Sequence, residues 1–362
     1  MKTEVLQNPQ TKTRTVYLDY LRVFATFAVI VIHTCADLWS TGTVLSFEWN
    51  VLTVYECLVR WCVPIFVMIS GILFLDLDRE INMKQLFTKN ILRLTTAYAF
   101  WSFCHSFVEN RQEINVLKIL SQTIGGTTHL WFIPMIVGLY LVIPFLKGII
   151  KDSRQTKYFL FLFVLFTVLI PQAIVFIYDC LNVNLLVLVS DPFRNILKNM
   201  NLYLPLGYAG YFVLGYTLNN IKLSQKQRIF IYAAGLFSII ATLVLTIFVS
   251  VRYSRPLSYF FDYLTVNVML ESIAVFIFFK HLFQKIKISD RVNSFVAKLS
   301  KYSFGIYLCH ILVLKIAEKI GLTAVSFNPI FAIPVTALFV FIVSCIISAV
   351  IHKIPVLKKY IV

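Results

Sequence analysis

The chain has 362 residues, a net charge of +16, a hydrophobic fraction of 59% and only 14% charged residues. Soluble domains are about half apolar and about a quarter charged, so this composition excludes a water-soluble globule. The apolar residues form separate runs of about 20, the length that crosses a hydrocarbon core of roughly 30 Å. The sequence therefore predicts an all-α polytopic membrane protein.

Polar breaks between the apolar runs predict about ten transmembrane helices. In chain order they lie near residues 17–39, 52–75, 86–108, 129–150, 158–178, 201–219, 229–251, 263–283, 303–320 and 330–352. An even number of spans places both termini on one side. That side carries most of the Lys and Arg residues of the connecting segments, so the positive-inside rule predicts cytoplasmic N- and C-termini. Because the basic charge follows the topology, we expect no nucleic-acid partner.

The spans leave room for one integral domain with short tails. We expect a cytoplasmic N-terminal tail over residues 1–16, a transmembrane domain over 17–352 and a short basic cytoplasmic tail over 353–362. The first apolar run is too long for the core of a cleaved signal peptide, so we expect it to remain as an anchor. The seven cysteines are scattered through apolar segments without CxxC spacing, which predicts neither a disulfide framework nor a metal site.

The first span carries the most informative polar groups. A charged side chain inside a membrane costs about 2.5–3.5 kcal/mol on insertion scales, so each one needs a partner or a function. Arg22 and His33 are eleven residues apart, which is about 16 Å along the helix and three turns with almost no angular offset. Asp37 follows one turn later on the same face.

This polar seam has a functional and a structural interpretation. An arginine fork near the cytoplasmic surface suits phosphate recognition. A neutral imidazole deeper in the membrane suits proton abstraction from a hydroxyl. Alternatively, Arg22 extends to lipid phosphates and His33 is a hydrogen-bonded packing residue.

Polar and aromatic residues also open the third and the fourth predicted spans. Lys89 and Arg93 are four residues apart, hence on one helical face, and are either a second basic site or ordinary flanking charges. His129 is either catalytic or a surface histidine. Trp131 is either an interfacial aromatic anchor or part of an acceptor site.

Two later spans carry further candidates. Tyr307 and His310 share a face of the ninth span, where they line the same cavity as the first span or join helices by hydrogen bonds. Glu271 is a buried acid of the eighth span that orients an imidazole or pairs with a basic group. Metal-ligand spacing such as HExxH is absent from the sequence.

Together these segments resemble the acyltransferase 3 family of integral membrane acyltransferases. The resemblance is carried by residues 17–22 with the Arg-x10-His spacing to His33, and by segments 64–71, 130–132, 138–140, 212–215 and 303–310. The motifs run in order from about residue 15 to 350. The ordered set is more specific than any one motif.

The resemblance implies a ten-helix enzyme of the bacterial cytoplasmic membrane. Such an enzyme transfers an acyl group, commonly acetyl, from cytoplasmic acyl-CoA to a sugar hydroxyl of a cell-envelope polysaccharide or its lipid-linked precursor. It implies acetyl-CoA or another acyl-CoA as the donor substrate and no tightly bound cofactor. Arg22 and His33 then match the paired basic and catalytic groups. Arg93 matches the second arginine of an Arg-x-x-Arg pair whose first position here is Asn90, beside Lys89.

On this basis we expect Arg22, Arg93 and Lys89 to bind the donor phosphates. His33 then acts as a general base or as a covalent acyl carrier, and Asp37 fixes its tautomer. The candidates for the acceptor site are His129, Trp131, Tyr307, His310 and Glu271. Two other functions stay open: an exporter of polysaccharide or lipid-linked sugar, since a polar seam also suits a translocation path, and a noncatalytic membrane sensor or assembly partner.

Overall fold

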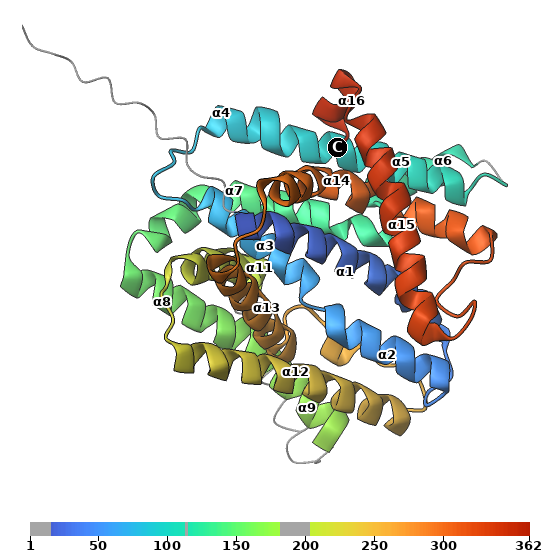
Figure 1. The fold of residues 1–362 in the computed structure, drawn as a ribbon, viewed down its shortest axis with the longest axis horizontal. Coiled ribbons are helices and arrows are strands. Elements are labelled where there is room, and N and C mark those ends of the chain that lie inside the picture. Colours follow the sequence, from blue (N-terminus) through green and yellow to red (C-terminus); the bar gives the residue numbers. More distant parts are fainter. Residues whose placement is uncertain (1–15, 113–114, 182–202) are drawn as a thin grey trace, which may run out of the picture.

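The computed structural model describes residues 16–112, 115–181 and 203–362, which form a bundle of helices (Figure 1). The longer helices are α1 (Val16–Thr41), α2 (Phe47–Val59), α3 (Cys62–Phe74), α5 (Leu92–Glu109), α6 (Val116–Gly125), α7 (Phe132–Ile150), α8 (Ser153–Leu162), α11 (Tyr203–Asn220), α12 (Gln225–Arg252), α13 (Val266–Lys285), α14 (Asp290–Lys319) and α15 (Pro329–Ile351). The short ones are α4 (Met83–Gln85), η1 (Leu86–Ile91), η2 (Thr128–Trp131), η3 (Phe163–Leu169), α9 (Ile170–Phe176), η4 (Ile177–Leu181), η5 (Tyr259–Phe261) and α16 (Pro355–Tyr360).

Within the described residues, eight helical segments are long and apolar enough to cross a bilayer. They are Val16–Thr41, Phe47–Phe74, Val116–Ile150, Ser153–Leu181, Gln225–Arg252, Tyr259–Lys285, Asp290–Lys319 and Pro329–Ile351. These segments coincide with eight of the ten predicted spans and confirm an all-α multi-pass membrane protein. The other two predictions fall on η1 with α5, which is rich in charged and hydroxyl-bearing residues, and on α11, whose predicted start at 201–202 lies outside the described residues. The side on which the termini lie stays a prediction.

Helix α1 lies in the middle of the bundle, where it contacts α2, α3, α13, α14 and α15 (dark blue in Figure 1). Leu21 and Ala25 are fully buried, and most other residues of the helix are buried with them. Burial on this scale means that neighbouring helices, rather than lipid, surround α1 over most of its surface. The helix therefore carries its polar residues into the interior of the protein.

Two glycines bring α3 and α11 into close contact. A Cβ atom at Gly71 would overlap the backbone of Phe212, and one at Gly215 would overlap the backbone of Met68. Small residues allow membrane helices to approach closely, because lipid leaves little hydrophobic force to drive their association. This contact holds α3, which forms one wall of the cavity described below.

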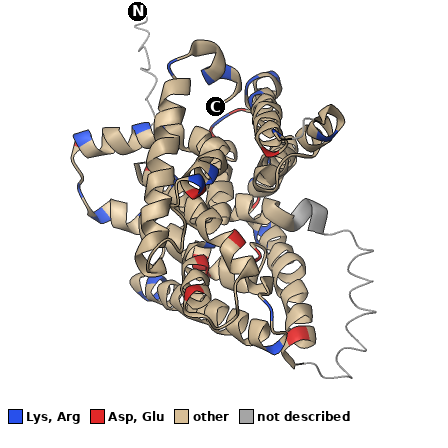
Figure 2. Cartoon of the chain, turned by 90° about the vertical axis from the view of Figure 1, so that its right-hand side faces the viewer, with Lys and Arg blue, Asp and Glu red and all other residues tan. Residues whose placement is uncertain are grey.

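The predicted span 52–75 is a broken helix. Helix α2 ends at Val59 and α3 begins at Cys62. Pro64 accounts for the break, since its ring clashes with the carbonyl four residues earlier, at Arg60. Arg60 caps α2 and forms an ion pair with the buried Glu56. Elsewhere Lys and Arg lie mainly at helix ends and connections, with few charges of either sign inside the bundle (Figure 2).

The C-terminal segment 353–362, predicted as a short basic tail, folds back onto the bundle. Helix α16 packs beside α5 (Figure 1). Trp101 Nε1 donates a hydrogen bond of 2.9 Å to the Ile361 carbonyl, and the Thr96 hydroxyl donates one of 2.6 Å to the Tyr360 carbonyl. Ile361 and Val362 are buried. These two apolar residues after the last lysine, together with the main-chain hydrogen bonds, anchor the segment.

Candidate functional site

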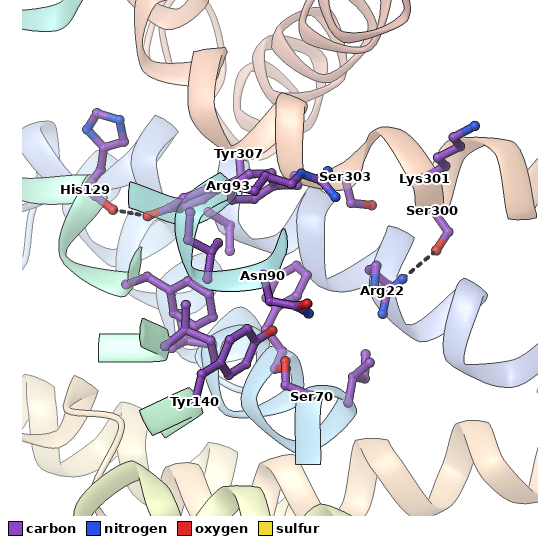
Figure 3. Close-up of a pocket in the computed structure, with 18 of the residues that line it drawn as sticks. Arg22, Ser70, Asn90, Arg93, His129, Tyr140, Ser300, Lys301, Ser303 and Tyr307 are labelled. Carbon is purple, nitrogen blue, oxygen red and sulfur yellow. Dashed lines mark hydrogen bonds between the residues drawn. The ribbon is translucent and has the colours of Figure 1, made fainter. Parts of the chain in front are cut away.

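A cavity of about 740 Å³ runs through the interior of the bundle. Its walls come from α1, α3, η1, α5, η2, α7 and α14, with the C-terminal segment at one end. Arg22 and His33 both line it. In Figure 3, Arg22 and Ser300 lie at one end and His129 at the other, with Tyr307 and Tyr140 between them. The eleven-residue spacing on α1 thus places an arginine and a histidine along one continuous space.

One end of the cavity is rich in cationic side chains. The predicted Arg22, Lys89 and Arg93 all line it. Arg22 Nη1 donates a hydrogen bond of 3.4 Å to the Ser300 hydroxyl. Arg93 Nε donates one of 2.7 Å to the Val362 carbonyl, so the C-terminal segment holds this arginine in place. The structure adds four residues that sequence reasoning did not select: Lys301, His352, Lys358 and Lys359.

The pKa of His352 reports the electrostatics of this basic end. Burial lowers the pKa of the imidazole, and the charges of Lys301, Arg93 and Lys358 lower it further, against a hydrogen bond to the Ser348 carbonyl that raises it. Several positive charges therefore act on one small region. Such a region attracts an anion that carries several negative charges, such as a nucleotide phosphate group.

The opposite end is built from histidines and aromatic residues. His33, His129, Trp131 and Tyr307 line it, as predicted candidates, together with Tyr263. The Tyr307 hydroxyl donates a hydrogen bond of 2.6 Å to the His129 carbonyl (Figure 3). The rings of Trp131 and Tyr263 stack with centroids 5.9 Å apart. This end combines an imidazole with flat aromatic surfaces, and acidic side chains are missing from its described wall.

Four histidines gather behind and beside this end. The ring centroid of His33 lies 5.1 Å from that of His310 and 6.2 Å from that of His129. His129 is in turn 4.4 Å from His105. Among residues 16–112, 115–181 and 203–362, no group of three or more His, Cys, Asp or Glu side chains is arranged to hold a metal ion. The cluster contains a predicted candidate, His310, beside His105, to which the sequence assigned no role.

Three of the predicted site residues do not reach the cavity wall. Asp37 is exposed at the end of α1, where its carbonyl accepts hydrogen bonds from the Ser40 and Thr41 hydroxyls. Glu271 and His310 are buried but do not line the cavity. For Asp37 the reason is geometric, because the polar face of α1 continues to the exposed end of the helix, whereas His33 is the last residue of α1 that lines the cavity.

Arg60 is the main charged residue that sequence reasoning missed. Its guanidinium lies 4.3 Å from the ring centroid of Phe261, and its charge is close enough to act on both His33 and Glu271. The signal was present, since Arg60 interrupts an apolar run and follows Glu56 by four residues, a spacing that pairs opposite charges on a helix. The roles expected for the buried acid Glu271 stay predictions.

Comparison with known families identifies the family of the chain. The model of the acyltransferase 3 family, described as an acyltransferase domain, matches residues 15–352, nearly the whole chain. No curated protein and no solved structure matches the chain. The match spans every helix that lines the cavity except α16. The chain therefore belongs to the acyltransferase 3 family of multi-pass membrane acyltransferases.

Proposed function

We propose that the protein transfers an acyl group, acetyl in the first instance, from cytoplasmic acyl-CoA to a sugar hydroxyl of a cell-envelope polysaccharide or its lipid-linked precursor. The observation that carries the proposal is the single cavity that joins Arg22, Lys89 and Arg93 to His33. Acyl-CoA has the matching shape, since a polyanionic nucleotide is connected to a reactive thioester by a long, narrow arm. The proposed setting is a bacterial cytoplasmic membrane.

The basic end is the proposed donor site. Arg22 and Arg93 present planar guanidinium groups, which bind phosphate oxygens through paired hydrogen bonds. Lys89 and the exposed Lys358 and Lys359 add charge at the opening. With the nucleotide held there, the pantetheine arm extends along the cavity toward His33, so that the thioester reaches the histidine end without leaving the protein.

The histidine end is the proposed site of transfer. A bare nitrogen of His33 takes the proton of the acceptor hydroxyl while the hydroxyl oxygen attacks the thioester carbonyl. The carbon–sulfur bond breaks, and the departing thiolate takes the proton from the His33 imidazolium. In the covalent variant of the mechanism, the same nitrogen attacks the thioester carbonyl, and the carbon–sulfur bond breaks to release the thiolate. The alcohol oxygen then attacks the acyl carbon, the nitrogen–acyl bond breaks to restore neutral His33, and the alcohol proton passes to the thiolate. Both routes require His33 to present an unprotonated nitrogen to the cavity.

Aromatic residues support a sugar as the acceptor. Trp131 and Tyr263 offer a stacked pair at the cavity wall, and a pyranose packs its C–H face on such rings. Tyr307 and His129 complete this part of the wall. We assign no substrate contact to Asp37, Glu271 or His310, because none of them lines the cavity.

The function is tested with purified protein in lipid nanodiscs, radiolabelled acetyl-CoA and glycan-bearing membranes from the source organism that lack the protein. We expect label to appear as a base-labile ester on glycan. In parallel, NMR of surface glycans from a strain without the gene should lack one ester signal, which the wild-type gene restores. A glycan exporter predicts instead that glycan moves across the membrane without acetyl-CoA and gains no label, and that result would remove the proposal.

A further inference from the structure

Hydrogen bonds to main-chain carbonyls determine which ring nitrogen carries the proton in two buried histidines near His33. His310 Nδ1 lies 2.6 Å from the Tyr307 carbonyl, and His105 Nε2 lies 3.2 Å from the Leu308 carbonyl. A carbonyl oxygen only accepts hydrogen bonds, so both of these nitrogens carry the proton. The other nitrogen of each neutral ring is then bare. Two adjacent carbonyls of α14 thus fix the tautomers of two imidazoles.

The bare nitrogens are buried acceptors in need of donors. His310 Nε2 and His105 Nδ1 have no hydrogen-bond partner among the described residues. A buried polar atom without a partner costs about 1–3 kcal/mol, so an N–H group is expected at each. The histidine ring nearest to the ring of His105 in this cluster is that of His129, with centroids 4.4 Å apart. For His310 it is His33, at 5.1 Å.

The separation of His33 and His310 fits a direct bond between their nitrogens. A hydrogen bond of about 2.9 Å places two imidazole centroids roughly 5 Å apart, because each nitrogen lies about 1 Å from its ring centre. The rings are inclined by 52°, and no hydrogen bond joins them among the described residues, so the bond requires a change of ring orientation. His33 borders the cavity while His310 is fully buried behind it.

We propose that His310 is a positioning residue that accepts the N–H of His33 and so holds the other His33 nitrogen bare toward the cavity. This inference rests on the proposed function. His310 thus fixes the tautomer of His33, the role that the sequence suggested for Asp37. It does so as a neutral acceptor, whose own tautomer is fixed by the hydrogen bond to the Tyr307 carbonyl. The proton of the acceptor hydroxyl still moves to His33 and then to the departing thiolate, while His310 keeps its own proton throughout.

The first test compares three variants in the nanodisc assay. His310→Phe removes the acceptor and should lower kcat about 10–100-fold, the loss seen when an outer-shell partner of a functional histidine is removed. The KM for acetyl-CoA should not change. His310→Gln places an amide oxygen near the position of Nε2 and should recover most of the loss. His105→Phe is the matched control, since His105 is equally buried and is also held by an α14 carbonyl, but it has no described ring contact with His33.

A second readout reports the tautomer itself. Nitrogen-15 NMR of histidine-labelled protein should show His33 as one tautomer in wild type and in His310→Gln, and as a mixture in His310→Phe. The wild-type spectrum alone carries the test if His310→Phe does not yield folded protein, because a mixed His33 tautomer there would overturn the inference. Unchanged kcat in His310→Phe, or a His310→Gln variant as slow as His310→Phe, would also overturn it.

Substitution of His33 and substitution of His310 distinguish the proposed function from the positioning role. Full turnover in a His33→Ala variant would remove the proposed function together with the role of His310. Loss of turnover in His33→Ala with unimpaired turnover in His310→Phe would leave the proposed function standing and remove only the positioning role.

Discussion

The two ends of the cavity are built on different principles. The basic end gathers several cations from separate elements, and Lys89, Lys301, Lys358 and Lys359 are all exposed. The histidine end depends on few groups, and short hydrogen bonds to main-chain carbonyls hold Tyr307 at its wall and His310 behind it. Redundant, solvated charges suit the capture of a polyanion. Fixed single groups suit chemistry, which depends on exact placement.

This contrast predicts which kinetic constant a substitution at each end of the cavity alters. Changes at the basic end should alter the KM for acyl-CoA and its dependence on salt. Changes at the histidine end should alter kcat. A substitution at one end that alters the kinetic constant assigned to the other end would contradict this division.

His33→Ala should lower kcat by about 10³-fold, since removal of a general base or nucleophile costs on the order of 10²–10⁴ in rate. The KM for acetyl-CoA should stay within about threefold of wild type, because the donor phosphates bind at the other end. The measurement is transfer of radiolabelled acetyl groups at several donor concentrations. His281→Ala serves as the control, as His281 does not line the cavity. A large rise in KM would show that the two ends are not separate.

Arg22→Ala should raise the KM for acetyl-CoA about 10–100-fold, because a hydrogen bond to a charged group contributes about 1.5–3 kcal/mol. The kcat at saturating donor should fall little. Arg22→Lys keeps the charge but loses the planar guanidinium, so its KM for acetyl-CoA should lie between those of wild type and Arg22→Ala. Direct donor binding, measured by calorimetry, should follow the same order. Arg22→Ala with wild-type affinity for acetyl-CoA would contradict the donor role of Arg22.

Tyr307→Phe should lower kcat by less than about tenfold and leave the donor KM unchanged. The substitution removes the hydroxyl that bonds the His129 carbonyl, and a hydrogen bond of this kind contributes about 0.5–1.5 kcal/mol. A thermal-unfolding assay in detergent should show a lower midpoint for this variant than for wild type. If the KM for acetyl-CoA rose instead, the donor would extend further toward Tyr307 than the account allows.

Lys359→Ala should have the smallest effect, a change in donor KM of less than about threefold, because an exposed charge contributes about 0–1 kcal/mol. The effect should disappear at high salt, where exposed charges are screened. Initial rates at low and high ionic strength provide the test. A loss as large as that of Arg22→Ala would mean that the basic end is not redundant.

The sequence was most informative where helical geometry alone decides the outcome. Eleven residues make three turns of one helix, so the joint placement of Arg22 and His33 on one cavity followed from spacing. The eight confirmed spans followed from hydropathy. Family motifs then supplied the chemistry that spacing could not, since spacing identifies a face and not a substrate.

Contacts between distant segments were beyond the sequence. The segment 353–362 is held at the basic end by hydrogen bonds that the side chains of Arg93, Thr96 and Trp101 donate to its main-chain carbonyls. No local sequence pattern encodes such bonds. The same holds for His105, which joins the histidine cluster through the Leu308 carbonyl of another helix. Asp37 was predicted on the same face as His33 but does not line the cavity. Helical periodicity assigns a residue to a face and does not show where along the helix the cavity ends.

The central claim is that one cavity carries the acyl-CoA arm from the basic end to His33. The most direct measurement is a cryo-EM map of the protein with a thioether analogue of acetyl-CoA, which binds but cannot transfer its acyl group. The account predicts phosphate density at Arg22 and Arg93, the arm inside the cavity, and the thioether end in contact with His33. A nucleotide bound elsewhere, or an arm that leaves the cavity before His33, would contradict it.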